Sequence, residues 1–148
     1  MTSVVTHAST DRHAEWGGTR RYIRIVIHPD TPSLRKAATR YTGGDFTNAA
    51  GCFHPAPDRE RYDEERDEWK QVTDPHWAGV LRLSRDSLHT EAVTHECVHA
   101  ALAIYRMDVA VVPNLGNGCG PREETLAYIV GDLTHSVVNA LHAAGVYQ

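Results

Sequence analysis

The hydrophobic positions of this chain alternate with polar ones in the first half and recur with a helical period in the second half. Residues 21–29, RYIRIVIHP, place three isoleucines at alternate positions, which predicts a strand with one strongly apolar face. Residues 78–86, AGVLRLSRD, alternate in a similar way and predict another strand. Between them, residues 45–57, DFTNAAGCFHPAP, predict a further strand that Pro55 and Pro57 terminate.

The remaining segments of the first half have weaker or different signals. Residues 30–44, DTPSLRKAATRYTGG, predict a helix that Thr31 caps and that the two final glycines end. Residues 57–71 are dense in both charge signs, which predicts a solvated helix or an excursion between strands. Residues 1–19 show no clear period, and we expect them to be loose or to form a weak edge element.

Two longer segments in the second half have helical periodicity. Residues 87–106 form the first, and Asp86 or Ser87 can cap its start. Its apolar face consists of Val93, Cys97, Ala100 and Ile104. Residues 121–145 begin with a proline, carry two acids in the first turn and end at a glycine, as helices often do. The apolar face of this second helix consists of Leu126, Ile129, Val130, Leu133, Val137 and Leu141.

These elements predict an α+β fold in one domain, residues 1–148, with a small three- to four-stranded sheet packed on two long core helices. A chain of 148 residues is long enough to bury a core of its own. The net charge of -4 does not favour broad attraction to nucleic acid or to an anionic membrane, so neither is expected as a partner.

Composition also sets an expected compartment. No apolar run is long enough to span a bilayer, and the N-terminal residues lack the basic and apolar regions of a signal peptide. Three cysteines are an odd number and too few for a disulfide framework. We therefore expect a cytoplasmic protein.

The segment THECVHA, residues 94–100, contains the pattern H-E-x-x-H within the first long helix. His95 and His99 lie four positions apart, so they share one helix face and can bind the same zinc ion. Glu96 is rotated off the line of the two histidines, which suits a group that contacts a water rather than the metal. Because the chain contains ten histidines, the pattern needs support from its surroundings.

A catalytic zinc ion usually has three protein ligands and one open position. Glu123 and Glu124 open the next long helix and follow His99 by 24 and 25 positions. A second helix packed against the first could present one of these carboxylates to the metal. The helix dipole favours the ionised form of an acid in the first turn.

The combination HECVHAAL…EETLAYIVGDL resembles the gluzincin group of zinc metallopeptidases, and more narrowly the minigluzincins and small phage-encoded metallopeptidases. The resemblance covers roughly residues 79–135. It implies a zincin-like core, one Zn²⁺ per chain and a peptide or protein substrate. Because Ala127 follows Glu124 by three positions, the family pattern makes Glu124 the third ligand and Glu123 the alternative.

The resemblance also implies a hydrolytic mechanism. Zinc would activate a water, and Glu96 would accept its proton as the water attacks a peptide carbonyl. Candidates for stabilising the oxyanion are Tyr105, Tyr128 and His135, and Asp132 is a candidate for orienting a zinc-binding histidine. In this family the strand before the H-E-x-x-H helix forms the rim of the cleft. Residues 78–86 hold that position and could pair with an extended peptide.

Three other interpretations compete with a peptidase. The zinc could be purely structural, although such sites favour cysteines and do not need Glu96. The chain could be a catalytically silent zinc-binding protein, for example a phage factor that captures a host protein on a metallopeptidase scaffold. It could also bind no metal. Cys97 falls on the apolar helix face, which indicates a core residue, whereas Cys119 lies in a glycine-rich loop and could reach the metal.

Overall fold

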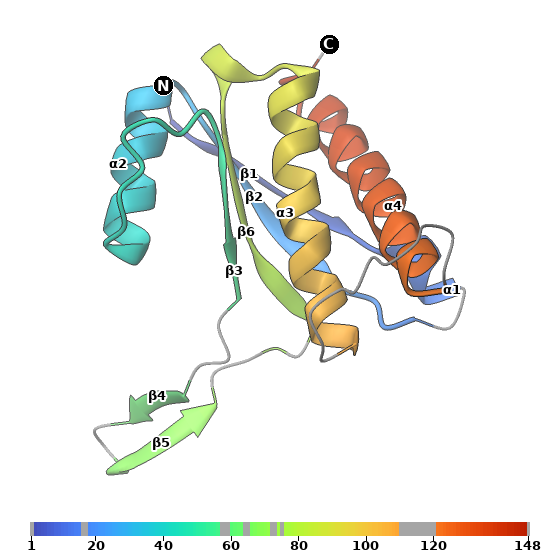
Figure 1. The fold of residues 1–148 in the computed structure, drawn as a ribbon. Helices are drawn as coiled ribbons and strands as arrows, with labels where there is room; N and C mark the ends of the chain where they lie inside the picture. The colour runs from blue at the N-terminus through green and yellow to red at the C-terminus, as the bar shows by residue number, and fades with distance from the viewer. Residues whose placement is uncertain are drawn as a thin grey trace.

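A computed structural model describes most of the chain (Figure 1). The described residues are 2–15, 18–56, 60–63, 66–71, 74, 76–109 and 121–147. The elements are β1 (Val4–Ser9), α1 (Asp11–Glu15), β2 (Tyr22–His28), α2 (Thr31–Thr42), β3 (Cys52–Pro55), β4 (Glu60–Asp63), β5 (Glu68–Gln71), β6 (Trp77–Ser84), a 3-10 helix (Arg85–Ser87), α3 (Thr90–Val109) and α4 (Pro121–Ala143). The three strands and three helices predicted from periodicity are all present.

Four strands form the main sheet in the order β1-β2-β6-β3. The neighbours β2 and β6 are parallel, whereas β1 pairs antiparallel with β2 and β3 pairs antiparallel with β6. The strands β4 and β5 form a separate antiparallel hairpin that projects beyond one end of the main sheet (Figure 1). The charged run at residues 57–71 is therefore an excursion between strands, one of its two predicted forms.

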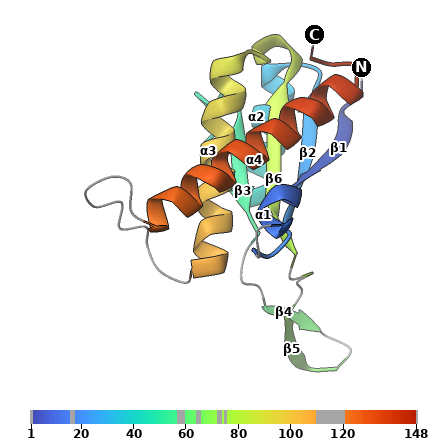
Figure 2. The same ribbon diagram turned by 90° about the vertical axis from the view of Figure 1, so that its right-hand side faces the viewer.

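The helices lie in two layers on opposite faces of the main sheet (Figures 1 and 2). The long helices α3 and α4 pack side by side on one face and α2 lies on the other. The main core contains Ile23, Ile25 and Ile27 of β2, Leu81 and Leu83 of β6, Val93, Cys97, Ala100 and Ile104 of α3, and Ile129, Leu133, Val137 and Leu141 of α4. The α+β class and the predicted apolar helix faces are confirmed.

The N-terminal segment was expected to be loose or to form a weak edge element. It contains β1, an outer strand of the main sheet, which is well packed. Six residues of β1 pair in register with β2, and Ala8 is buried in the main core with Val4 packed against it. The period is hidden because Val5, on the opposite face of β1, is also apolar although it is exposed. Pairing with β2 and packing beneath α4 order a segment whose own pattern is weak.

The helix α2 starts and ends close to the predicted positions, but its N-cap is Asp30 and not Thr31. The Asp30 carboxylate accepts a hydrogen bond from the backbone N–H of Ser33 at 2.7 Å. Thr31 is the first helical residue, and its hydroxyl donates to Asp86 at 2.6 Å. The C-terminal signal is confirmed, because Gly43 adopts a left-handed conformation with φ 74°.

The start of α3 also differs from the prediction. Asp86 and Ser87, the expected caps, lie in the short 3-10 helix, and α3 begins at Thr90. The ring Nδ1 of His89 accepts a hydrogen bond from the backbone N–H of Ala92 at 3.2 Å, so His89 satisfies one of the free N–H groups at this end. Asp86 is instead engaged with α2, as described above.

The strand β6 occupies the middle of the sheet, between β2 and β3. Both of its backbone edges are therefore paired, and the expectation that residues 78–86 could pair with a peptide is wrong. The outer strand on the side of α3 is β3.

Within the described ranges, no helix combines the length and the apolar character needed to cross a membrane.

Candidate metal centre

The helix α3 brings His95 and His99 together on its exposed side. Their Nε2 atoms lie 3.2 Å apart, and the ring centroids are 4.9 Å apart with the rings close to perpendicular. Two nitrogen ligands of a tetrahedral zinc ion, each about 2.0–2.1 Å from the metal, are about 3.3 Å apart. This separation is compatible with two ligands of one zinc ion, and it is also that of a hydrogen bond between the two rings.

Glu96 lies beside this histidine pair but is buried. Its side chain is 8% exposed, whereas the side chain of the adjacent His95 is 65% exposed. The Glu96 Oε1 atom lies 3.9 Å from His95 Nε2. Burial raises the pKa of Glu96, and the two nearby imidazoles oppose that shift. The two candidate ligands and the candidate proton acceptor thus occupy one short stretch of helix, with the acid turned toward the protein.

Glu123 and Glu124 lie in the first turn of α4, as predicted, with Glu123 half-buried and Glu124 exposed. The structure does not bring either carboxylate to the histidine pair, because no three His, Cys, Asp or Glu side chains of the described residues are grouped to hold a metal ion. The helix α3 continues about 15 Å beyond His99 before it ends at Val109. The helix α4 begins beside that far portion of α3 (Figures 1 and 2). A glutamate as third ligand stays a prediction.

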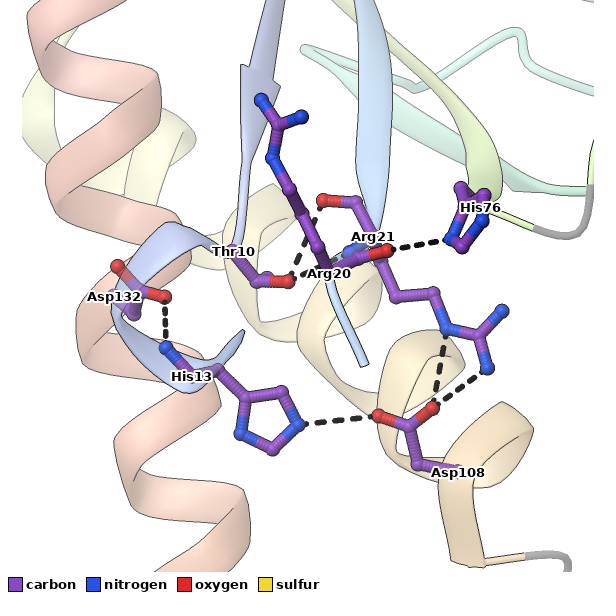
Figure 3. A network of polar contacts seen from close by, with 7 residues as sticks. All are labelled: Thr10, His13, Arg20, Arg21, His76, Asp108 and Asp132. Carbon is purple, nitrogen blue, oxygen red and sulfur yellow. Dashed lines mark hydrogen bonds and ion pairs between the residues drawn. The ribbon is translucent and has the colours of Figure 1, made fainter. Parts of the chain in front are cut away.

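The three residues suggested for supporting roles lie along α4. Asp132 is buried and accepts a hydrogen bond from the backbone N–H of His13 at 3.0 Å, so it holds α1 (Figure 3). His135 is exposed, and its Nε2 lies 3.0 Å from the Asn139 amide. Tyr128 is 51% exposed. Their proposed roles at a zinc ion stay predictions, and Asp132 already has a different partner.

Tyr105, another candidate for the oxyanion, is fully buried in the main core. Its hydroxyl has no hydrogen-bond partner among the described residues. A buried hydroxyl cannot reach a substrate beside the exposed histidines without moving the helix. Cys97 is a core residue, as predicted. Cys119 lies outside the described residues.

Sequence reasoning missed the polar network that joins the N-terminal segment to both long helices (Figure 3). Asp108, near the end of α3, accepts two hydrogen bonds from the Arg21 guanidinium, at 3.1 and 2.8 Å. The Asp108 carboxylate also lies 3.2 Å from His13 Nε2. These partners are more than 80 positions apart in the chain, and no local pattern signals their pairing.

A second polar cluster lies under α2, on the sheet face opposite α3. The Arg82 Nε donates to His54 Nε2 at 3.1 Å, and Arg82 Nη1 lies 3.3 Å from His28 Nε2. Burial and the Arg82 charge lower the pKa of His54 to about 4 and also lower that of His28. Both histidines are therefore hydrogen-bonded structural groups.

Cys52 adjoins this cluster, with its Sγ atom 3.6 Å from His54 Nε2. Burial, reinforced by the charge of Glu96, raises the pKa of the Cys52 thiol to about 12. A neutral thiol is a poor zinc ligand and a poor nucleophile. Cys52 thus belongs to the packing of β3.

Comparison of the chain with protein-family models, curated proteins and solved structures found no match.

Proposed function

We propose that this protein is a zinc-dependent metallopeptidase built on a zincin-like core. The observation that supports this most is the placement of His95, Glu96 and His99. The two imidazole nitrogens are 3.2 Å apart, as two zinc ligands should be, and a buried carboxylate lies beside them. A helix that merely carried surface histidines would not need the intervening acid to be buried.

In the proposed mechanism, His95 and His99 hold the metal through their Nε2 atoms. Zinc, when bound, supplies a Lewis acid that polarises a carbonyl group and acidifies water. Glu96 accepts the proton of the attacking water on its carboxylate and returns it to the leaving amine. The raised pKa of Glu96 suits a group that must both accept and release a proton.

The substrate class proposed is a peptide or an unfolded protein segment. Among the described residues, the outer strand β3 pairs with β6 alone in the main sheet, which supports an extended chain being accepted at its other edge. This strand packs against α3, and the residue before it touches Glu96. A peptide paired with β3 would therefore run close to Glu96. In this proposal β3 takes the peptide-binding role that the sequence analysis had assigned to residues 78–86.

A second candidate is a catalytically silent zinc-binding protein, such as a phage factor that captures a host protein. The observation that favours it is that no third metal ligand joins the histidine pair among the described residues. A site with too few ligands would bind zinc weakly or leave it poorly oriented for hydrolysis.

The decisive experiment measures metal content and peptide cleavage together. Protein purified without a chelator or a metal-affinity tag should contain about one zinc per chain and cleave a mixed peptide pool. Glu96→Gln should keep the zinc and lose cleavage. A parent protein that holds zinc and cleaves no peptide would favour the silent scaffold, and a folded parent without zinc would end both proposals. In the same assay, Glu124→Gln and Glu123→Gln show which glutamate, if either, contributes to zinc affinity.

A further inference from the structure

Gly51, the residue directly before β3, lies against the side chain of Glu96. A Cβ atom built on Gly51 would stand 2.9 Å from Glu96 Cγ and 3.4 Å from Glu96 Cδ. On its other side the same atom would stand 3.3 Å from the backbone oxygen of Arg82. Gly51 is itself buried. The space that a side chain would need at position 51 is thus already filled by Glu96.

The backbone of Gly51 does not require a glycine. The described glycines with positive φ are Gly43, Gly79 and Gly145, and Gly51 is not among them. Its φ therefore lies outside the left-handed region that favours glycine. The reason for glycine at this position is therefore room for a neighbouring group, not freedom of the chain.

The two neighbours of Gly51 differ in how easily they can move. The Arg82 carbonyl belongs to the central strand β6, and Arg82 is the register partner of Cys52 in β3. Displacing it would disturb the β3–β6 ladder. Glu96 presents a side chain with rotatable bonds, so an added methyl group at position 51 would displace Glu96 first.

We propose that Gly51 is a positioning residue for Glu96: the missing side chain provides the space in which the Glu96 carboxylate lies buried beside the histidine pair. An alanine at position 51 would displace the Glu96 carboxylate from its present position and leave both histidines in place. The catalytic part of this inference rests on the proposed function, whereas the steric part does not.

The steric part is tested by a double-mutant cycle on the full-length protein, followed by thermal unfolding in the presence of EDTA. Gly51→Ala should lower the melting temperature by about 3–8 °C in the parent. In a Glu96→Ala background, which removes the clashing Cγ, the same substitution should lower it by less than about 2 °C. Equal losses in the two backgrounds would overturn the proposal. If Gly51→Ala alone does not fold, recovery of folding in the double variant supports it and failure of both overturns it.

A matched control separates this effect from a general cost of replacing glycine. Gly131 lies in α4, and a Cβ atom added to it would meet no neighbouring group within 4 Å. Gly131→Ala should leave the melting temperature unchanged or raise it slightly, and Glu96→Ala should not alter that result. If Glu96→Ala also reduced a loss of melting temperature caused by Gly131→Ala, the double-mutant cycle would not be measuring the contact between position 51 and Glu96.

The catalytic part is tested by zinc titration and steady-state kinetics of the same variants. Gly51→Ala should bind zinc with the parent's affinity and keep KM within about twofold. Its kcat should fall by about 100-fold, because a shift of about 1 Å in a reacting group has an effect of that size. An unchanged kcat would overturn the positioning role. If the parent cleaves no peptide, the proposed function fails, and the unfolding cycle still decides whether Gly51 holds Glu96.

Discussion

Adjacent residues of the H-E-x-x-H segment have opposite environments. His95 and His99 are exposed, and Glu96 between them is buried. This division follows from the helical geometry that the sequence predicts, since positions four apart share a face and the next position is rotated by about 100°. The identity of the residues that bury Glu96 could not be predicted, because Gly51, the residue directly before β3, lies 45 positions earlier in the chain.

The exposure of the two histidines predicts that they matter for metal binding and little for stability. His95→Gln and His99→Gln should each abolish stoichiometric zinc binding and peptide cleavage. Each should change the melting temperature of the metal-free protein by less than about 2 °C, because surface substitutions usually alter stability by less than about 0.5 kcal/mol. Elemental analysis and thermal unfolding measure the two effects. A His135→Gln variant, exposed on α4, is the control and should keep its zinc.

The buried His54 predicts a loss of stability in mild acid. Its pKa is lowered from 6.5 to about 4 in the folded protein, so the unfolded chain binds a proton more readily between those values. The free energy of unfolding should therefore decrease by about 2–3 kcal/mol as the pH falls from 6.5 to about 4. Below that range, protonation of His54 should cause no further decrease. Urea unfolding at several pH values measures this dependence.

His54→Gln keeps an acceptor for Arg82 but removes the titrating ring. This variant should have a shallower pH dependence between pH 6.5 and 4 than the parent. Substituting the exposed His7 by glutamine should leave the parent's dependence unchanged. If His54→Gln and the parent lose stability in parallel, then His54 is not the responsible group.

At the scale of elements, periodicity was a good guide wherever the apolar side chains of one face enter the main core. The strand at residues 22–28 and both long helices were predicted for this reason. The strand β1 and helix α1 could not be located within residues 1–19, because their order depends on contacts with distant segments. One such contact is the Asp132 carboxylate, which accepts from the backbone of His13.

The network at Asp108 joins the N-terminal elements to α3 and predicts a measurable contribution to stability. Asp108→Asn would remove the charge that faces the largely buried Arg21 guanidinium. We expect a loss of about 2–3 kcal/mol in the free energy of unfolding. The control is Asp11→Asn, which breaks an exposed ion pair with Arg20 and should cost less than about 1 kcal/mol. Similar losses in both variants would show that burial does not strengthen the Asp108 contacts.

At the scale of the whole molecule, the sequence predicted the α+β class and a sheet packed on two long helices. It did not predict the second helix layer, formed by α2, or the relative position of the two long helices. Glu124 was expected near His99 because both belong to a recurrent family pattern. That expectation needs the first turn of α4 to lie level with the histidine pair. Helix register of this kind depends on the loop between the helices and on packing along their full length, and neither can be read from one sequence.

Because the core is complete without any metal, the metal-free protein should remain folded. The main core draws its buried residues from β1, β2, β6, α3 and α4, whereas His95 and His99 lie at the surface. EDTA treatment should preserve the far-UV circular dichroism spectrum, and added zinc should raise the melting temperature by a few degrees in a concentration-dependent manner. Unfolding upon chelation would contradict this and would indicate a structural zinc.

The β4–β5 hairpin lies between two strands that are themselves neighbours. Pro55 of β3 is the register partner of Gly79 of β6, and the backbone N–H of Ala56 bonds to the Ala78 carbonyl at 2.8 Å. The insertion therefore leaves and rejoins the sheet at adjacent points. Replacing it with a short turn adds no loop-closure cost to the fold. A foreign epitope or a fluorescent reporter inserted in place of the hairpin should therefore leave the main core intact.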